Sequence, residues 1–105
     1  MSRETDRRLD SRASVDLYMN RYLDGEPYLC RATDISRSGM RLEPLHEPEG
    51  AHRFMGLQFQ LPGSDRVITA SAEAVSLPAG RGVGIRLTRI APEHLAIIDR
   101  YAKAA

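Results

Sequence analysis

Apolar side chains recur at every second position along most of this chain, and this period constrains the fold more than any other feature. Segment 14–23 is the clearest case, because one of its faces is apolar and the other is mostly polar. The apolar face would carry Val15, Leu17, Met19 and Leu23, and the other face Asp16, Tyr18, Asn20 and Tyr22. Successive side chains of a β-strand point to opposite sides, so this alternation predicts half-buried strands and a mainly β protein.

Turn-forming residues divide the alternating region into about six short strands. Asp24-Gly25 is a strong hairpin signal after the first segment, and Pro44 and Pro48 indicate a polar loop after the third. The candidate strands are 14–23, 28–33, 40–43, 55–61, 66–77 and 83–89, with 66–77 the longest. Short antiparallel strands at this spacing predict a barrel or a sandwich.

The period becomes that of a helix only at the C-terminal end. Leu95, Ile98 and Tyr101 recur at helical spacing, and Pro92 is suited to a first helical turn. Glu93 lies where a negative charge interacts favourably with the helix dipole. We therefore expect one amphipathic helix that packs on the barrel or over its mouth.

Length and charge narrow the classes of function. A chain of 105 residues is one domain by length, and its formal net charge of +1 argues against a bulk electrostatic nucleic-acid binder. The positive charge comes from fourteen arginines and a single lysine, Lys103. A guanidinium can bind a phosphate or a guanine edge through two parallel hydrogen bonds, which an ammonium cannot do.

Other features argue against catalysis, metal binding and membrane insertion. Cys30 has no partner for an internal disulfide, fits a reducing compartment, and is expected to be a small buried hydrophobe. His46, His52 and His94 lack metal-ligand spacing, and no catalytic triad or carboxylate pair is recognisable, so we expect no enzyme, metal or cofactor. The charged N-terminus has no apolar signal region and no apolar run could cross a bilayer, which favours a cytoplasmic protein.

Two short polar motifs remain, RRLDSR at 7–12 and DISRSG at 34–39. Each has an ordinary structural interpretation. The first would be a charged terminus exposed to solvent. The second would connect two strands, with Asp34 and Ser36 satisfying nearby backbone donors and Gly39 adopting a positive φ or forming a bulge.

Taken together, the motifs RxxxR (Arg8 and Arg12) and DxSxxG (Asp34, Ser36 and Gly39), one hairpin apart, resemble the signature of the PilZ domain family. PilZ domains are bacterial receptors for the second messenger cyclic di-GMP. The resemblance covers nearly the whole chain, because GVGIRLTRIAPEHLAIIDRYA is similar to the family's closing strand and C-terminal helix. It implies a six-stranded antiparallel β-barrel with a C-terminal helix, in which residues 1–13 form a flexible arm and 14–105 the barrel and helix.

The resemblance also implies a binding site. Arg8 and Arg12 would hold guanine and phosphate from the arm, while Asp34, Ser36 and Gly39 would form the opposing wall on the barrel. This chemistry suits the ligand, because a carboxylate accepts hydrogen bonds from the guanine N1–H and N2–H₂ groups and arginine binds phosphate or guanine O6 and N7. Closure of the arm would be a disorder-to-order switch that relays the signal to an unidentified downstream protein.

Two further arginines bear on this expected site. In the family, an arginine directly before RxxxR, here Arg7, often accompanies binding of cyclic di-GMP as an intercalated dimer. The resemblance therefore implies two ligand molecules per chain. For Arg37, inside DISRSG, the alternatives of a ligand contact and of exposure to solvent stay open.

Two other classes of function compete with a receptor. A PilZ-like barrel can be a ligand-independent protein-interaction adaptor, but such members usually lack the arginines or DxSxxG, and this chain has both. A small β-barrel can also bind single-stranded nucleic acid, with Tyr18, Tyr22 and Tyr28 as stacking platforms. The nearly neutral net charge argues against that second alternative.

Overall fold

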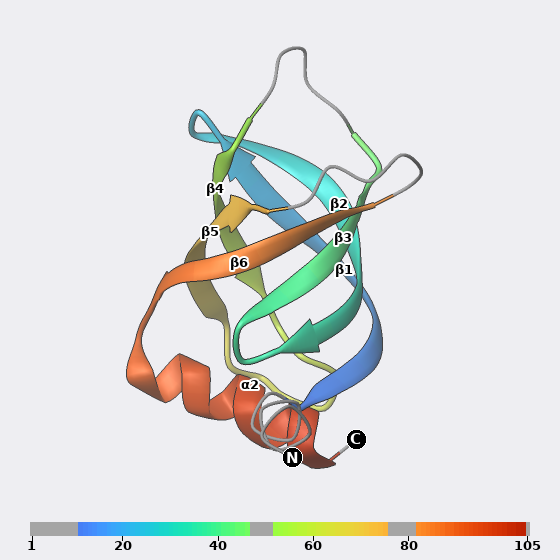
Figure 1. The fold of residues 1–105 in the computed structure, drawn as a ribbon, viewed down its shortest axis with the longest axis vertical. Coiled ribbons are helices and arrows are strands. Elements are labelled where there is room, and N and C mark those ends of the chain that lie inside the picture. Colours follow the sequence, from blue (N-terminus) through green and yellow to red (C-terminus); the bar gives the residue numbers. More distant parts are fainter. Residues whose placement is uncertain (1–10, 47–51, 76–81, 105) are drawn as a thin grey trace, which may run out of the picture.

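Six antiparallel strands close into a barrel in the computed structural model, which describes residues 11–46, 52–75 and 82–104 (Figure 1). The strands are β1 (Arg12–Leu23), β2 (Glu26–Ser36), β3 (Gly39–Pro44), β4 (Phe54–Phe59), β5 (Ile68–Ala74) and β6 (Val83–Ile90). Around the barrel their order is β1-β2-β3-β6-β5-β4, and β4 pairs back with β1. The barrel is confirmed, and the sandwich that the strand spacing also allowed is excluded.

The hairpin between β1 and β2 forms at the predicted Asp24-Gly25 pair. Both residues lie in the left-handed region, with φ of 53° and 81°, and Leu23 pairs directly with Glu26. A two-residue turn with positive φ at both positions has the twist that antiparallel strands require. The local sequence therefore sets the register of the two longest strands.

Several strands differ in length from the predicted segments. β1 begins at Arg12 rather than Ser14, and β2 continues to Ser36 rather than ending at Thr33. The reason is that the two ends pair with each other, from Arg12 opposite Ser36 onward, so polar residues are held in a ladder. Arg12 and Ala13 thus belong to the barrel strand, whereas positions 1–10 of the expected arm lie outside the described residues.

The prediction that segment 66–77 forms the longest strand is wrong. β5 ends at Ala74, and β1, with 12 residues, is the longest strand in the described part of the chain. Position 67 is exposed and the ladder with β4 begins only at Ile68, opposite Phe59. Val67 and Val75 are apolar, but both are exposed and lie just outside the strand.

The core is built from the alternating positions that the sequence marked. Its fully or nearly fully buried side chains include Met19, Leu23, Cys30, Leu42, Met55, Leu57, Phe59, Leu61, Ile68 and Ile85. Burial raises the pKa of the Cys30 thiol to about 11, as expected for an inert, small hydrophobe. Arg21 is a charged exception on the same face of β1, 5% exposed, and its Nη2 donates to the carbonyl of His46 at 3.1 Å.

One helix, α2 (Pro92–Ala104), lies across one end of the barrel (Figure 1). It begins at the predicted Pro92 and buries Ile98 and Ala102 in the core, against β1 and β2. The start of β1 and the turn between β2 and β3 lie at this same end. Within the described residues, no helix is long and apolar enough to cross a membrane.

Candidate ligand-binding site

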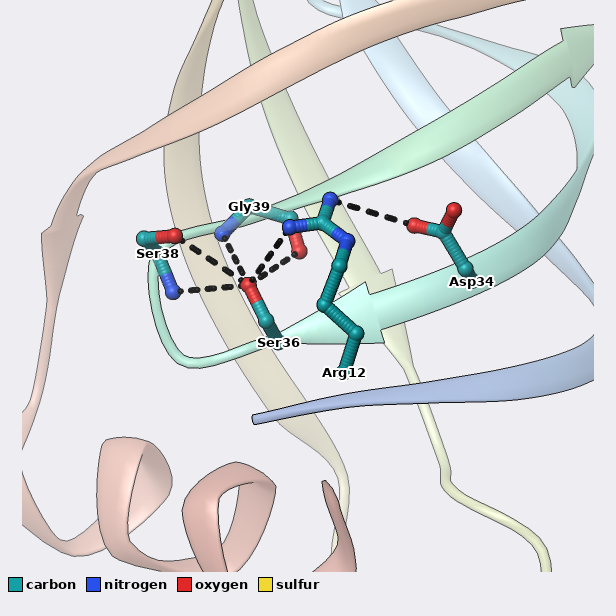
Figure 2. A network of polar contacts seen from close by, with 5 residues as sticks. All are labelled: Arg12, Asp34, Ser36, Ser38 and Gly39. Atoms are coloured by element: carbon teal, nitrogen blue, oxygen red, sulfur yellow. Dashed lines mark hydrogen bonds and ion pairs between the residues drawn. The ribbon is translucent and has the colours of Figure 1, made fainter. Parts of the chain in front are cut away.

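The pairing of β1 with β2 brings the two sequence motifs together. Arg12 lies opposite Ser36 and Ser14 opposite Asp34, so the end of the first motif runs beside the start of the second (Figure 2). Two register shifts flank the site, one in the β1–β2 ladder between Ser14 and Leu17 and one in the β2–β3 ladder between Ala32 and Asp34. Such irregularities locally bend a ladder and redirect its side chains.

Arg12 extends from β1 over β2 and contacts two signature residues at once. Its Nη2 lies 3.3 Å from Asp34 Oδ1, and its Nη1 donates to Ser36 Oγ at 3.4 Å. The Arg12 and Asp34 side chains are 51% and 33% exposed, so both remain accessible from solvent. The site thus presents a guanidinium and a carboxylate side by side on the outside of the barrel.

Ser36, in contrast, is fully buried and organises the turn between β2 and β3. Its Oγ accepts hydrogen bonds from the backbone N–H of Ser38 at 3.2 Å and of Gly39 at 3.3 Å. The same oxygen lies 3.1 Å from Ser38 Oγ and 3.5 Å from the Gly39 carbonyl (Figure 2). The prediction that a side chain of this motif satisfies nearby backbone donors is therefore confirmed for Ser36, while Asp34 pairs with Arg12 instead.

Gly39 is required for a reason that the sequence did not indicate. A Cβ at this position would collide with the carbonyl oxygen of Ile85 and lie 3.2 Å from its carbonyl carbon. Its φ is not in the left-handed region, which among the described glycines holds only Gly25, Gly63 and Gly82. The expectation of a positive φ or a bulge at Gly39 is wrong: the close approach of β3 to β6 excludes a side chain there.

The remaining arginines of the two motifs differ in what the structure says of them. Arg7 and Arg8 lie outside the described residues. Arg37 is exposed at the tip of the β2–β3 turn, between the ends of the two strands. Ser38 was missed in the sequence, although a second hydroxyl two residues after Ser36 was the available signal.

A second charged cluster lies next to the site and has a structural role. Glu73 of β5 is only 7% exposed and pairs with Arg86 of β6 and with Arg53, each at 2.6 Å. Hydrogen bonds from Arg86 and then Arg53 lower the pKa of the Glu73 carboxyl. Arg86 is also paired with Gly39 in the β3–β6 ladder. The cluster therefore links the strand next to Gly39 to β5.

No group of three metal-ligating side chains occurs within 11–46, 52–75 and 82–104. The accessible polar side chains at the site include the Arg12 guanidinium, the Asp34 carboxylate and the hydroxyl of the exposed Ser38. They suit recognition of an anion together with a donor edge.

Comparison with known proteins identifies what the chain is similar to. The family model of the PilZ domain matches residues 6–104. The fold is similar to that of the Bacillus subtilis inhibitor of motility MotI/DgrA, with a TM-score of 0.75 and 17% identity over 90% of this chain and 49% of that one. It is also similar to Borreliella burgdorferi PlzA in complex with c-di-GMP, with a TM-score of 0.65 and 18% identity over 95% and 45% of the two chains.

Both similar structures belong to longer chains. The present chain therefore spans about half the length of each protein that it matches in fold. No curated protein sequence matches the chain.

Proposed function

Since the chain belongs to the PilZ domain family, we propose that it is a bacterial receptor that binds cyclic di-GMP and performs no catalysis. The observation that carries this proposal is the pairing that sets Arg12 beside Asp34 on an accessible face of the barrel. Those two groups are complementary to the two parts of the ligand. A cytoplasmic location is part of the proposal, because the lone Cys30 is a free thiol.

The two accessible groups would divide the recognition of the ligand between them. The Arg12 guanidinium would bind a phosphate, or guanine O6 and N7, through two parallel hydrogen bonds. The Asp34 carboxylate would accept hydrogen bonds from guanine N1–H and N2–H₂. A good bidentate contact of this kind contributes about 1–3 kcal/mol to discrimination between bases in DNA complexes.

Ser36 and Gly39 would act through the backbone that they shape. Ser36 is buried and its hydroxyl is surrounded by the turn, so its role would be to position the β2–β3 turn rather than to face the ligand. Gly39 permits the close approach of β3 to β6 directly after the β2–β3 turn. We therefore assign both as positioning residues of the proposed site.

Arg7 and Arg8 would complete the site from the N-terminal side. Arg8 would contact guanine and phosphate, and Arg7 would allow a second cyclic di-GMP molecule to intercalate with the first. Ordering of this segment on binding would then be the signal passed to a downstream protein. Fixing each residue costs about 1–2 kcal/mol of conformational entropy, which charge-assisted contacts to the ligand would offset.

Isothermal titration of the purified chain with cyclic di-GMP tests the proposal, with GTP and cyclic di-AMP as control ligands. We expect micromolar or tighter binding of cyclic di-GMP only, at about two ligands per chain if Arg7 acts as proposed. Arg8→Ala and Arg12→Ala should each weaken binding at least tenfold, because each removes a charge-assisted contact.

The matched control is Arg66→Ala, which removes an exposed arginine from the connection between β4 and β5. It should bind cyclic di-GMP like the parent. Absence of binding by the parent would reject the receptor and favour the adaptor that acts through protein contacts alone. A ratio of one ligand per chain would reject the role of Arg7 only.

A further inference from the structure

The two groups that would face the ligand contact each other in this structure. Arg12 Nη2 lies 3.3 Å from Asp34 Oδ1, and Arg12 Nη1 lies 3.4 Å from Ser36 Oγ (Figure 2). Both terminal nitrogens of the guanidinium are thereby engaged by the opposite wall of the site. An anion that takes both terminal nitrogens of Arg12 in a bidentate contact therefore competes with those two contacts.

This contact is long compared with the other arginine–carboxylate pairs described in the barrel. Arg31 lies 2.6 Å from Asp16, and Arg86 lies 2.6 Å from Glu73. Charge-assisted N–H···O bonds are typically about 2.7–2.9 Å, so the Arg12–Asp34 contact at 3.3 Å is a weak one. Its two side chains are also half and one-third exposed, which further weakens an ion pair through solvation.

We infer that the Arg12–Asp34 pair selects the ligand, because binding separates the pair and both side chains then need a new partner on the ligand. A ligand with both an anion and a guanine edge gives each group a new partner: the anion takes Arg12, and the N1–H and N2–H₂ donors take Asp34. An anion without that donor edge takes Arg12 but leaves the Asp34 carboxylate without its cation and close to a second negative charge. Asp34 thus discriminates against ligands that lack guanine, in addition to accepting hydrogen bonds from guanine.

The inference rests on the proposed function and concerns how the same site excludes other anions. The inference and a simple acceptor role for Asp34 predict different effects of substituting Asp34 on the binding of anions that lack guanine. If Asp34 only accepts hydrogen bonds from guanine, its neutralisation strengthens the binding of other anions no more than neutralisation of another nearby carboxylate does. If Asp34 also holds Arg12, its neutralisation strengthens the binding of those anions beyond that, and only while Arg12 is present.

The deciding variant is Asp34→Asn, titrated with cyclic di-AMP and with inorganic pyrophosphate and followed by NMR chemical shifts. We expect both ligands to bind about two- to fivefold more tightly than to the parent, the range that corresponds to an exposed ion pair. Cyclic di-GMP should bind tenfold or more weakly, because the Asn side chain keeps one acceptor oxygen but turns an NH₂ donor toward the N1–H and N2–H₂ donors of guanine. Unchanged or weaker binding of both control ligands would overturn the inference.

Removal of a negative charge also strengthens anion binding by reducing long-range electrostatic repulsion. Two controls separate this effect from the loss of the Arg12–Asp34 contact. Asp16→Asn removes the same charge from a β1 carboxylate that pairs with Arg31 rather than Arg12, and should leave pyrophosphate binding unchanged. In an Arg12→Ala background, Asp34→Asn should likewise give no gain. A gain that persists without Arg12 would show a field effect and reject the inference.

The same titrations distinguish the failure of this inference from that of the proposed function. If the parent does not bind cyclic di-GMP, the receptor is rejected, while the pyrophosphate cycle still measures the coupling between Arg12 and Asp34. If the parent binds cyclic di-GMP but the pyrophosphate affinities of the parent, the two single variants and the double variant show no coupling between Arg12 and Asp34, only the further inference is rejected. Thermal melts of each variant identify any loss of folding.

Discussion

At the scale of single residues, the signature positions that the structure describes divide into two groups by exposure. Arg12 and Asp34 are accessible and polar, whereas Ser36 is fully buried and Gly39 has no room for a side chain. A motif of uniform appearance in the sequence therefore contains residues that would contact a ligand and residues that shape the backbone beneath it. The two kinds should respond differently to substitution.

Gly39→Ala should destabilise the fold rather than remove a ligand contact. The added methyl group collides with the Ile85 carbonyl, and overpacking of this kind typically costs about 1–3 kcal/mol. Gly56→Ala is the matched control, because the new Cβ would lie 3.6 Å from the Tyr22 Cβ, an ordinary contact. Urea unfolding of both variants measures the difference, and equal stabilities would contradict the packing argument.

At the scale of elements, the strands are joined by charged contacts as well as by backbone ladders. Glu73 of β5 connects β6 through Arg86 and the start of β4 through Arg53, and it is nearly inaccessible to solvent. Arg31 of β2 similarly links Asp16 of β1 to Glu43 of β3. Ion pairs thus join the three strands that carry the site to one another and tie β6 to β5.

The Glu73 cluster predicts a specific loss of stability in acid. Because the pKa of Glu73 is lower in the folded state than its ordinary value, this group stabilises the fold above the ordinary glutamate range. The contribution is lost as the pH falls through the folded-state pKa. Glu73→Gln should therefore lower the free energy of unfolding near neutral pH and show a smaller further loss in acid than the parent.

Urea unfolding at about pH 7 and about pH 3.5 tests this prediction. Glu26→Gln serves as the control, since Glu26 is an exposed glutamate of β2. Parallel acid losses in the parent and in Glu73→Gln would show that the cluster does not contribute in this way.

At the scale of the whole molecule, closure of the barrel leaves little freedom for the strands to rearrange. Each of the six described strands pairs on both sides, and α2 packs across the end that carries the site. Rearrangement of a closed barrel would require breaking ladders. We therefore expect ligand binding to alter the N-terminal segment and leave the barrel strands as they are.

Binding should then raise the stability of the whole molecule by linkage. Free cyclic di-GMP at one hundred times its Kd should increase the free energy of unfolding by about 2.7 kcal/mol per site. For a domain of this size, each kcal/mol raises the Tm by about 4–8 °C. Differential scanning calorimetry with and without ligand measures the shift, and Arg12→Ala, with binding at least tenfold weaker, should show about half of it or less at the same ligand concentration.

The sequence by itself determined the type and order of the elements, the fold family and the candidate residues of the site. Alternation of apolar residues, the Asp24-Gly25 turn and Pro92 are local signals, because each acts through the conformation of a few neighbouring residues. The motif order and the closing segment sufficed for the PilZ resemblance, which the family model confirms.

Only the tertiary structure decided how those residues divide their roles. The burial of Ser36, the collision that Gly39 avoids and the pairing of Arg12 with Asp34 all depend on strands that meet after long intervals of sequence. The extensions of β1 and β2 have the same origin, because polar residues become strand when a partner ladder satisfies their backbone groups. Local sequence patterns do not indicate which atoms of a distant strand will lie next to a given residue. The site is shaped by such contacts between distant strands.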